Sequence, residues 1–92
     1  MTKSDIVSKI SHRTSIKQSS VRSVTDALFD IIQEVVSEGG GVHLRNFGVF
    51  SQKKRARRVA RNIAKNTAMI IDEHYAPSFK PASFFTQKVR NS

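Results

Sequence analysis

Residues 53–66 carry seven cationic side chains and no acidic one. The seven are Lys53, Lys54, Arg55, Arg57, Arg58, Arg61 and Lys65. Neither the helical period nor the strand period places all of them on one face, so the segment is not patterned to pack against a core. A phosphate backbone would neutralise such a run and release its own bound counterions. The run therefore predicts contact with a polyanion, with an affinity that falls steeply as salt is added.

The excess charge of the whole chain lies in the same half as this run. The chain has 92 residues and a formal net charge of +9, from 16 Lys and Arg against 7 Asp and Glu. Residues 1–44 contain five basic and five acidic side chains, whereas residues 45–92 contain eleven basic and two acidic ones. This asymmetry indicates that the second half binds the polyanion.

Other kinds of chemistry lack the residues that they need. The chain has no cysteine, and His12, His43 and His74 are not spaced as zinc ligands. Asp72 and Glu73 are adjacent, so on a strand they would point to opposite sides and form no acid–base pair. No nucleophile elbow or phosphate-binding glycine loop is present, and no apolar run approaches the length of a membrane span. We therefore expect no enzyme activity, no metal, no cofactor and no membrane partner.

Two helices are predicted in residues 1–41. Thr2 or Ser4 would cap the first helix, which is expected to end near Arg13. The second begins near Val21, and its apolar residues recur at spacings of three and four. Gly39–Gly41 must end it, because a glycine triplet has a large entropic cost inside a helix.

The second helix is better suited to packing than to reading DNA. Its polar positions hold Asp26, Asp30, Glu34 and Glu38, which would repel phosphates, and this argues against a helix-turn-helix reader. Its apolar stripe is wide enough to serve more than one neighbour. A chain this short buries a limited fraction of its surface, so association with a second copy is a natural remedy.

The second half is predicted to be mainly extended. Polar and apolar residues alternate over 42–44, and the phase restarts after 46–48, which predicts a short hairpin. The apolar run 68–71 could pair back against the basic run, the prolines favour extended chain over 77–81, and a last helix is expected at about 83–90. Five phenylalanines are expected in the core rather than as platforms for stacked bases: Phe47, Phe50, Phe79, Phe84 and Phe85.

The order of these parts resembles the bacterial histone-like HU/IHF family over essentially the whole chain. The most specific matches are Phe47-Gly48-Val49-Phe50, the spacing of Arg55, Arg58 and Arg61-Asn62, and Phe79-Lys80-Pro81. The resemblance implies an α/β (α+β) fold in which two chains intertwine as a helical body topped by a β-saddle. Two extended β-ribbon arms then reach around duplex DNA in the minor groove.

The resemblance also implies how the chain is divided and which residues form its site. We expect a single domain over 1–92, with a helical dimerisation body in 1–41, β-saddle and arm in 42–81, the arm at about 53–74, and a C-terminal helix in 82–92. The expected DNA-binding residues are Lys53, Arg55, Arg57, Arg58, Arg61, Asn62, Ile63, Lys65 and Lys80. The expected dimer core is formed by Val24, Leu28, Ile31, Ile32, Val35, Phe47, Phe50 and Phe79.

The chain departs from the family pattern at three positions. Ile63 stands where the family usually has a proline that wedges between base pairs; isoleucine is also an apolar wedge but lacks the fixed φ of proline. Asn66 replaces a glycine that is frequent in the turn of the arm, and Asn46 replaces a common glycine before Phe47. Asparagine tolerates the left-handed conformation at both positions. We expect these exchanges to affect how strongly the protein bends DNA.

We therefore expect an architectural protein that clasps the minor groove of double-stranded DNA and bends or compacts it, mostly without strict sequence specificity. A homodimer is expected, with a heterodimer as the alternative, located in the cytoplasm on the nucleoid or on viral DNA. Two other functions remain open: RNA or single-strand binding by the basic run, and site-specific bending as one subunit of a heterodimer. The absence of aromatic residues from 51–74 argues against single-strand recognition by stacking.

Overall fold

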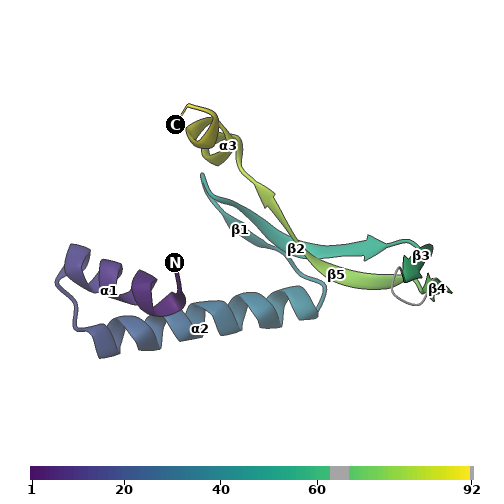
Figure 1. Ribbon diagram of the computed structural model, residues 1–92. Coiled ribbons are helices and arrows are strands. Elements are labelled where there is room, and N and C mark those ends of the chain that lie inside the picture. The colour runs from purple at the N-terminus through teal and green to yellow at the C-terminus, as the bar shows by residue number, and fades with distance from the viewer. Residues whose placement is uncertain (63–66, 92) are drawn as a thin grey trace. The chain divides into compact units, whose positions relative to one another are not determined.

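The computed structural model describes residues 1–62 and 67–91, which form an α+β fold of three helices and five strands (Figure 1). The elements in chain order are α1 (Lys3–Thr14), α2 (Gln18–Ser37), β1 (Val42–Leu44), β2 (Gly48–Arg55), β3 (Arg58–Asn62), β4 (Thr67–Ile71), β5 (His74–Pro81) and α3 (Ser83–Arg90). The chain divides into two compact units, Met1–Glu34 and Val35–Ser92, so that α2 runs from the first into the second.

A capping box begins α1 and selects Thr2 from the two expected caps. The Thr2 backbone N–H donates to Asp5 Oδ2 at 2.8 Å, and the Asp5 backbone N–H donates to Thr2 Oγ1 at 3.3 Å. The hydrogen bond from the Thr2 backbone to the Asp5 carboxyl, and after it the bond that the Thr2 hydroxyl donates to Asp5 Oδ2 at 3.1 Å, lower the pKa of that carboxyl. The helix ends at Ser15, which adopts a left-handed conformation with φ of 61° and donates its backbone N–H to the Ser11 carbonyl.

In the first unit, α1 and α2 bury a small set of side chains. Val7 is fully buried, and Val21 and Thr25 of α2 are nearly so. Lys3 Nζ lies 2.6 Å from Asp26 Oδ1, which joins the first turn of α1 to α2 at the surface. The core of this unit is therefore narrow, with most of the large apolar residues of α2 outside it.

The glycine triplet ends α2 as the sequence predicted. Gly39 has a φ of 87°, a left-handed conformation that L side chains rarely adopt. Its N–H donates to the Val36 carbonyl at 3.0 Å, and the Gly40 N–H donates to the Val35 carbonyl at 2.9 Å. The last carbonyls of the helix are thereby satisfied, and the chain turns toward β1.

The second unit contains a three-stranded antiparallel sheet in the order β1-β2-β5 and a two-stranded sheet of β3 and β4. The hairpin between β1 and β2 turns at Asn46, whose φ of 63° confirms the tolerance expected of asparagine there. The apolar run does pair against the basic run, from Arg58 opposite Ile71 to Asn62 opposite Thr67. The extended chain before Pro81 and the final helix are also as predicted.

Phenylalanines gather where β1, β2, β5 and α3 meet. Phe50 and Phe79 face each other across β2 and β5 with ring centroids 4.7 Å apart. Phe47 lies 5.3 Å from Phe79 and 5.3 Å from Phe85 of α3. Phe84 was expected in the core but is 59% exposed, so four of the five expected core phenylalanines form one cluster.

The β2–β5 pairing leaves no room for a side chain at Gly48. A Cβ atom at this position would lie 2.5 Å from the Lys80 carbonyl oxygen and 2.6 Å from the Phe79 ring. Gly48→Ala is therefore expected to lower the free energy of unfolding by about 1–3 kcal/mol, because the backbone of β5 and the aromatic cluster would have to shift. Urea denaturation measures the change. Gly41→Ala is the matched control, since its closest approach is 3.3 Å to the end of the His43 side chain; equal losses for the two variants would contradict the prediction.

Candidate nucleic-acid interface

The pairing of β2 with β5 sorts the side chains of both strands onto two faces. Residues directly opposite each other share a face, and neighbours along a strand alternate between faces. The register runs from Gly48 opposite Pro81 to Arg55 opposite His74 without a break. One face, here called the cationic face, comprises Val49 with Lys80, Ser51 with Ser78, Lys53 with Ala76, and Arg55 with His74. The other, the aromatic face, comprises Gly48 with Pro81, Phe50 with Phe79, Gln52 with Pro77, and Lys54 with Tyr75.

The cationic face carries positive charge and hydroxyl groups and no acidic side chain. Lys53, Arg55 and Lys80 are all exposed, so their charges can meet a ligand in solution. Ser51 and Ser78 lie between them as opposed hydroxyl groups, which can donate to phosphate oxygens. This combination of exposed cations and hydroxyl groups is suited to binding a polyanion.

Lys54 lies on the aromatic face and is already paired. Its Nζ atom is 2.6 Å from Glu73 Oε1, and the two side chains are about half exposed. The basic run is therefore divided: consecutive lysines point to opposite faces of the sheet, and one of them has an acidic partner.

Along β3 and β4 each arginine stands opposite an apolar residue. Arg58 pairs with Ile71 and Arg61 pairs with Ala68, and their spacing of three places the two arginines on opposite faces. Val59 and Ile70 are 71% and 59% exposed. This two-stranded ribbon thus offers cations and uncovered apolar side chains together.

The structure describes part of the expected arm. Arg57 lies in the short link between β2 and β3, and Asn62 ends β3. Ile63, Lys65 and Asn66 lie outside the described residues.

Further basic residues adjoin the cationic face. His43 of β1 stands opposite Val49 of the central strand, so it shares this face and lies on the other side of Val49 from Lys80. A depression of about 430 Å³ is lined by His43, Arg45 and Lys80 among others. Five residues of this region were not among the binding residues expected from the sequence: His43, Arg45, Ser51, Ser78 and His74. On a strand, positions an odd number of residues from the core residues Phe50 and Phe79 point to the opposite face, and this spacing would have found the two serines and His74.

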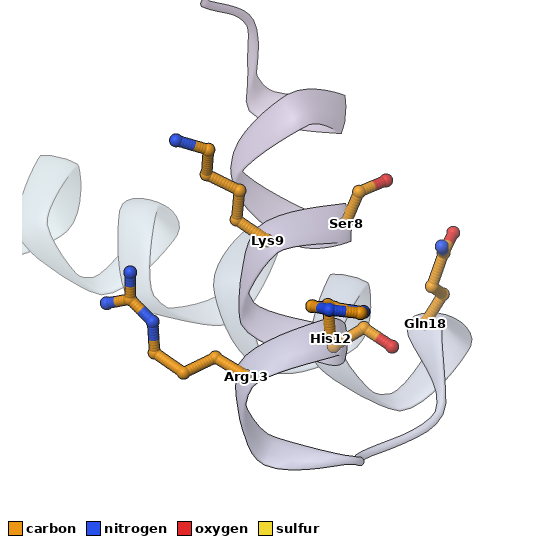
Figure 2. A pocket seen from close by; sticks show the side chains of 6 residues that line it. Ser8, Lys9, His12, Arg13 and Gln18 are labelled. Atoms are coloured by element: carbon orange, nitrogen blue, oxygen red, sulfur yellow. The ribbon is translucent and has the colours of Figure 1, made fainter.

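A larger depression, of about 630 Å³, lies on the helical unit between α1 and the start of α2. Figure 2 shows that Lys9 and Arg13 extend to one side of α1, whereas Ser8, His12 and Gln18 lie on the other. These polar groups do not converge on one point, so they form a poorer ligand site than the cationic face.

Among the residues that the structure describes, no three His, Cys, Asp or Glu side chains are grouped so as to hold a metal ion. Within the same part of the chain, no helix combines the length and the apolar character needed to cross a membrane.

Several residues of the expected dimer core are uncovered in the single chain. Val24, Leu28 and Ile31 of α2 are 70%, 47% and 55% exposed. Ile32 and Val35 are partly covered, and the Phe47 and Phe79 rings of the aromatic cluster remain partly open. Over the described residues, the apolar side chains that are buried are Val7, Val21 and Val36.

Sequence comparison identifies relatives over almost the whole chain. The family model described as "Bacterial DNA-binding protein" matches residues 1–90. The DNA-binding protein HU of Thermus thermophilus is 30% identical over 90 residues, which cover 98% of this chain and 93% of that protein. The integration host factor subunit beta of Shewanella denitrificans is 35% identical over 92 residues, which cover 97% of this chain and 95% of that subunit.

Comparison with solved structures gives the same result. The chain is similar to HU in the Anabaena HU–DNA cocrystal structure, with a TM-score of 0.92, 30% identity and full coverage of both chains. HU from Thermotoga maritima, at 20% identity and a TM-score of 0.69, shares the fold. The match of the family model, the identities and the common fold together show that this chain belongs to the HU/IHF family of bacterial DNA-binding proteins.

Proposed function

We propose that this protein is an architectural protein that clasps the minor groove of duplex DNA and bends or compacts it, mostly without strict sequence specificity. The observation that carries the proposal is the separation of the cationic face from the aromatic face by the β2–β5 register. One side of the sheet exposes cationic side chains that phosphates could contact, whereas the Phe50 and Phe79 rings on the other side pack against Phe47 and Phe85.

The chemistry of the cationic face supports binding to the DNA backbone rather than to base edges. Lysine, arginine and serine side chains contact phosphates without regard to sequence. Specificity would then come from the deformability of the DNA, because flexible or already bent sites lower the cost of distortion. The relative of known structure with the highest similarity given above was crystallised with DNA, which fits this mode.

The ribbon of β3 and β4 supports contact in the groove. Arg57, Arg58 and Arg61 would neutralise phosphates along the groove walls, and the exposed Val59 and Ile70 would meet the sugar and base surfaces inside it. We propose that Asn62, Ile63 and Lys65 continue this contact toward the tip, where Ile63 would wedge between base pairs.

A second copy of the chain would supply the missing core. Val24, Leu28 and Ile31 expose apolar surface on one helix, and such a surface is stable in water when another chain covers it. We propose a homodimer in which these residues, with Ile32, Val35 and the aromatic cluster, form the buried interface. One relative is named as subunit beta of integration host factor, so a heterodimer that bends DNA at specific sites is the second candidate.

RNA or single-strand binding is the remaining candidate. It has less support, because residues 51–74 contain no Phe, Tyr or Trp on which unpaired bases could stack. Competition between RNA, single-stranded DNA and nicked duplex DNA distinguishes the two, and preference for RNA would reverse the order. A duplex-binding architectural protein would be located on the nucleoid or on viral DNA in the cytoplasm.

Substitutions at Lys53 and Lys54 test whether the cationic face, rather than the aromatic face, binds DNA. Lys53→Gln is expected to reduce the slope of log K against log salt by about 0.9 for each Lys53 that contacts a phosphate, because one fewer counterion is released. Fluorescence anisotropy with a short linear duplex between low and physiological salt measures the slope. The control is the double variant Lys54→Gln/Glu73→Gln, which removes the ion pair of the aromatic face and keeps the net charge. Equal slopes for the two variants would refute the assignment, and the absence of duplex binding at low salt would refute the function.

A substitution at Leu28 tests whether this residue lies in the interface of a homodimer. In an isolated chain Leu28 is about half exposed, so Leu28→Asp would change stability little. In the proposed interface the same substitution would bury an unpaired carboxylate, so Leu28→Asp is expected to weaken the dimer by about 3–5 kcal/mol. Sedimentation equilibrium of the protein expressed alone should show a dimer for wild type and for the control Glu34→Gln, and a monomer or unfolded chain for Leu28→Asp. A wild-type monomer would argue against self-pairing.

Substitutions at Ile63 test whether its side chain inserts between base pairs. Ile63→Ala is expected to reduce the bend angle because a methyl group is too small to hold a base step apart, whereas Ile63→Pro should preserve or increase it. Energy transfer between dyes at the two ends of a duplex, at saturating protein, measures the bend. If neither variant changes the angle, Ile63 takes no part in bending.

A further inference from the structure

We infer that His74 contacts a DNA phosphate in its protonated form, so that the affinity for duplex DNA rises as the pH falls through the range in which histidine titrates. This inference rests on the proposed function, since it requires the cationic face to bind DNA. It adds a binding residue that neither the basic run nor the family resemblance nominated.

The position of His74 places it among phosphate ligands. It is the first residue of β5 and stands directly opposite Arg55, and Lys53 occupies the adjacent row of the same face. The side chain is exposed. A phosphate held by Arg55 would therefore lie within reach of the imidazole.

The hydrogen bond of the ring fixes what neutral His74 can offer. Its Nδ1 atom lies 3.0 Å from the Asp72 carbonyl oxygen. A carbonyl oxygen only accepts, so Nδ1 carries the proton and Nε2 of the neutral ring is an acceptor. An acceptor facing a phosphate oxygen is repelled. Protonation converts Nε2 into a charged donor, which is the form that binds phosphate.

The charged groups nearby set the direction of the effect. Arg55 and Lys53 are positive on the same face, and Arg57 follows β2 in the chain. The nearest acids in sequence are Asp72 and Glu73, and the Glu73 carboxylate is engaged by Lys54. Bound DNA phosphates would add negative charge beside the ring and favour its protonated form. Binding therefore takes up a proton, and the contribution of His74 is present at low pH and lost as the pH rises.

The other two histidines occupy different places. His43 shares the cationic face but lies in the row of Val49 and Lys80, at the opposite end from His74. His12 lies on α1. Because both carry the same imidazole group as His74, the test is made in a His43→Asn background, with His12→Asn added as a matched control.

The experiment compares duplex affinity at pH 5.5 and pH 8.0 by fluorescence anisotropy at fixed ionic strength. Acidification should tighten binding of the His43→Asn protein about fivefold to tenfold. It should also steepen the salt slope by about 0.9 for each His74 that meets a phosphate. Adding His74→Asn should remove both effects, and adding His12→Asn should leave them. Adding His74→Lys should give tight binding at both pH values, because the charge is then permanent.

A second experiment measures proton uptake on DNA binding directly. Calorimetric titration in two buffers of different protonation enthalpy gives the number of protons taken up on binding, which should fall when His74→Asn is added and stay when His12→Asn is added. The inference is overturned if His74→Asn retains the pH effect and the proton uptake. That result leaves the proposed function intact as long as duplex DNA is bound at pH 8.0, whereas loss of all duplex binding by the parent protein would overturn the function itself.

Discussion

The antiparallel pairing of β2 with β5 is the constraint on which the rest of the second unit depends. The ladder joins all eight residues of each strand, and the close Phe50–Phe79 pair fixes its register from one side. Gly48 permits the approach at one end, because its missing side chain leaves room for the Phe79 ring and the Lys80 carbonyl. Once this register is set, each residue of the basic run that lies in β2 has its face decided by parity alone.

Local patterns in the sequence were sufficient to predict the elements. The capping signals, the glycine triplet and the Asn46–Gly48 turn act over a few residues, and each produced the structure expected of it. The boundaries moved slightly: α1 extends to Thr14, and α2 begins at Gln18, before the first apolar residue of its stripe. These shifts arise because polar residues at helix ends carry no periodic signal.

The division of the cations could not be predicted in the same way. Which lysine of the Lys53-Lys54 pair faces a ligand depends on the pairing with β5, whose residues are more than twenty positions away. The ion pair between Lys54 and Glu73 is likewise non-local. Arg57 lies in the break between the strands at residues 56–57 and Arg58 follows it, so the alternation loses its phase there. The number of charges in the sequence is enough to predict the class of partner. The direction in which each charged side chain points is known only once the strand pairing of the sheet is known.

The unbroken register between β2 and β5 also limits how the length of this chain can change during evolution. Insertion or deletion of one residue within β2 would move every later side chain to the opposite face, bringing Lys54 out toward the ligand and turning Lys53 and Arg55 inward. A change of two residues would restore the alternation and alter the ladder by two residue pairs, one on each face. Length variants that persist in β2 should therefore differ by an even number of residues, or else carry a bulge that absorbs the odd one.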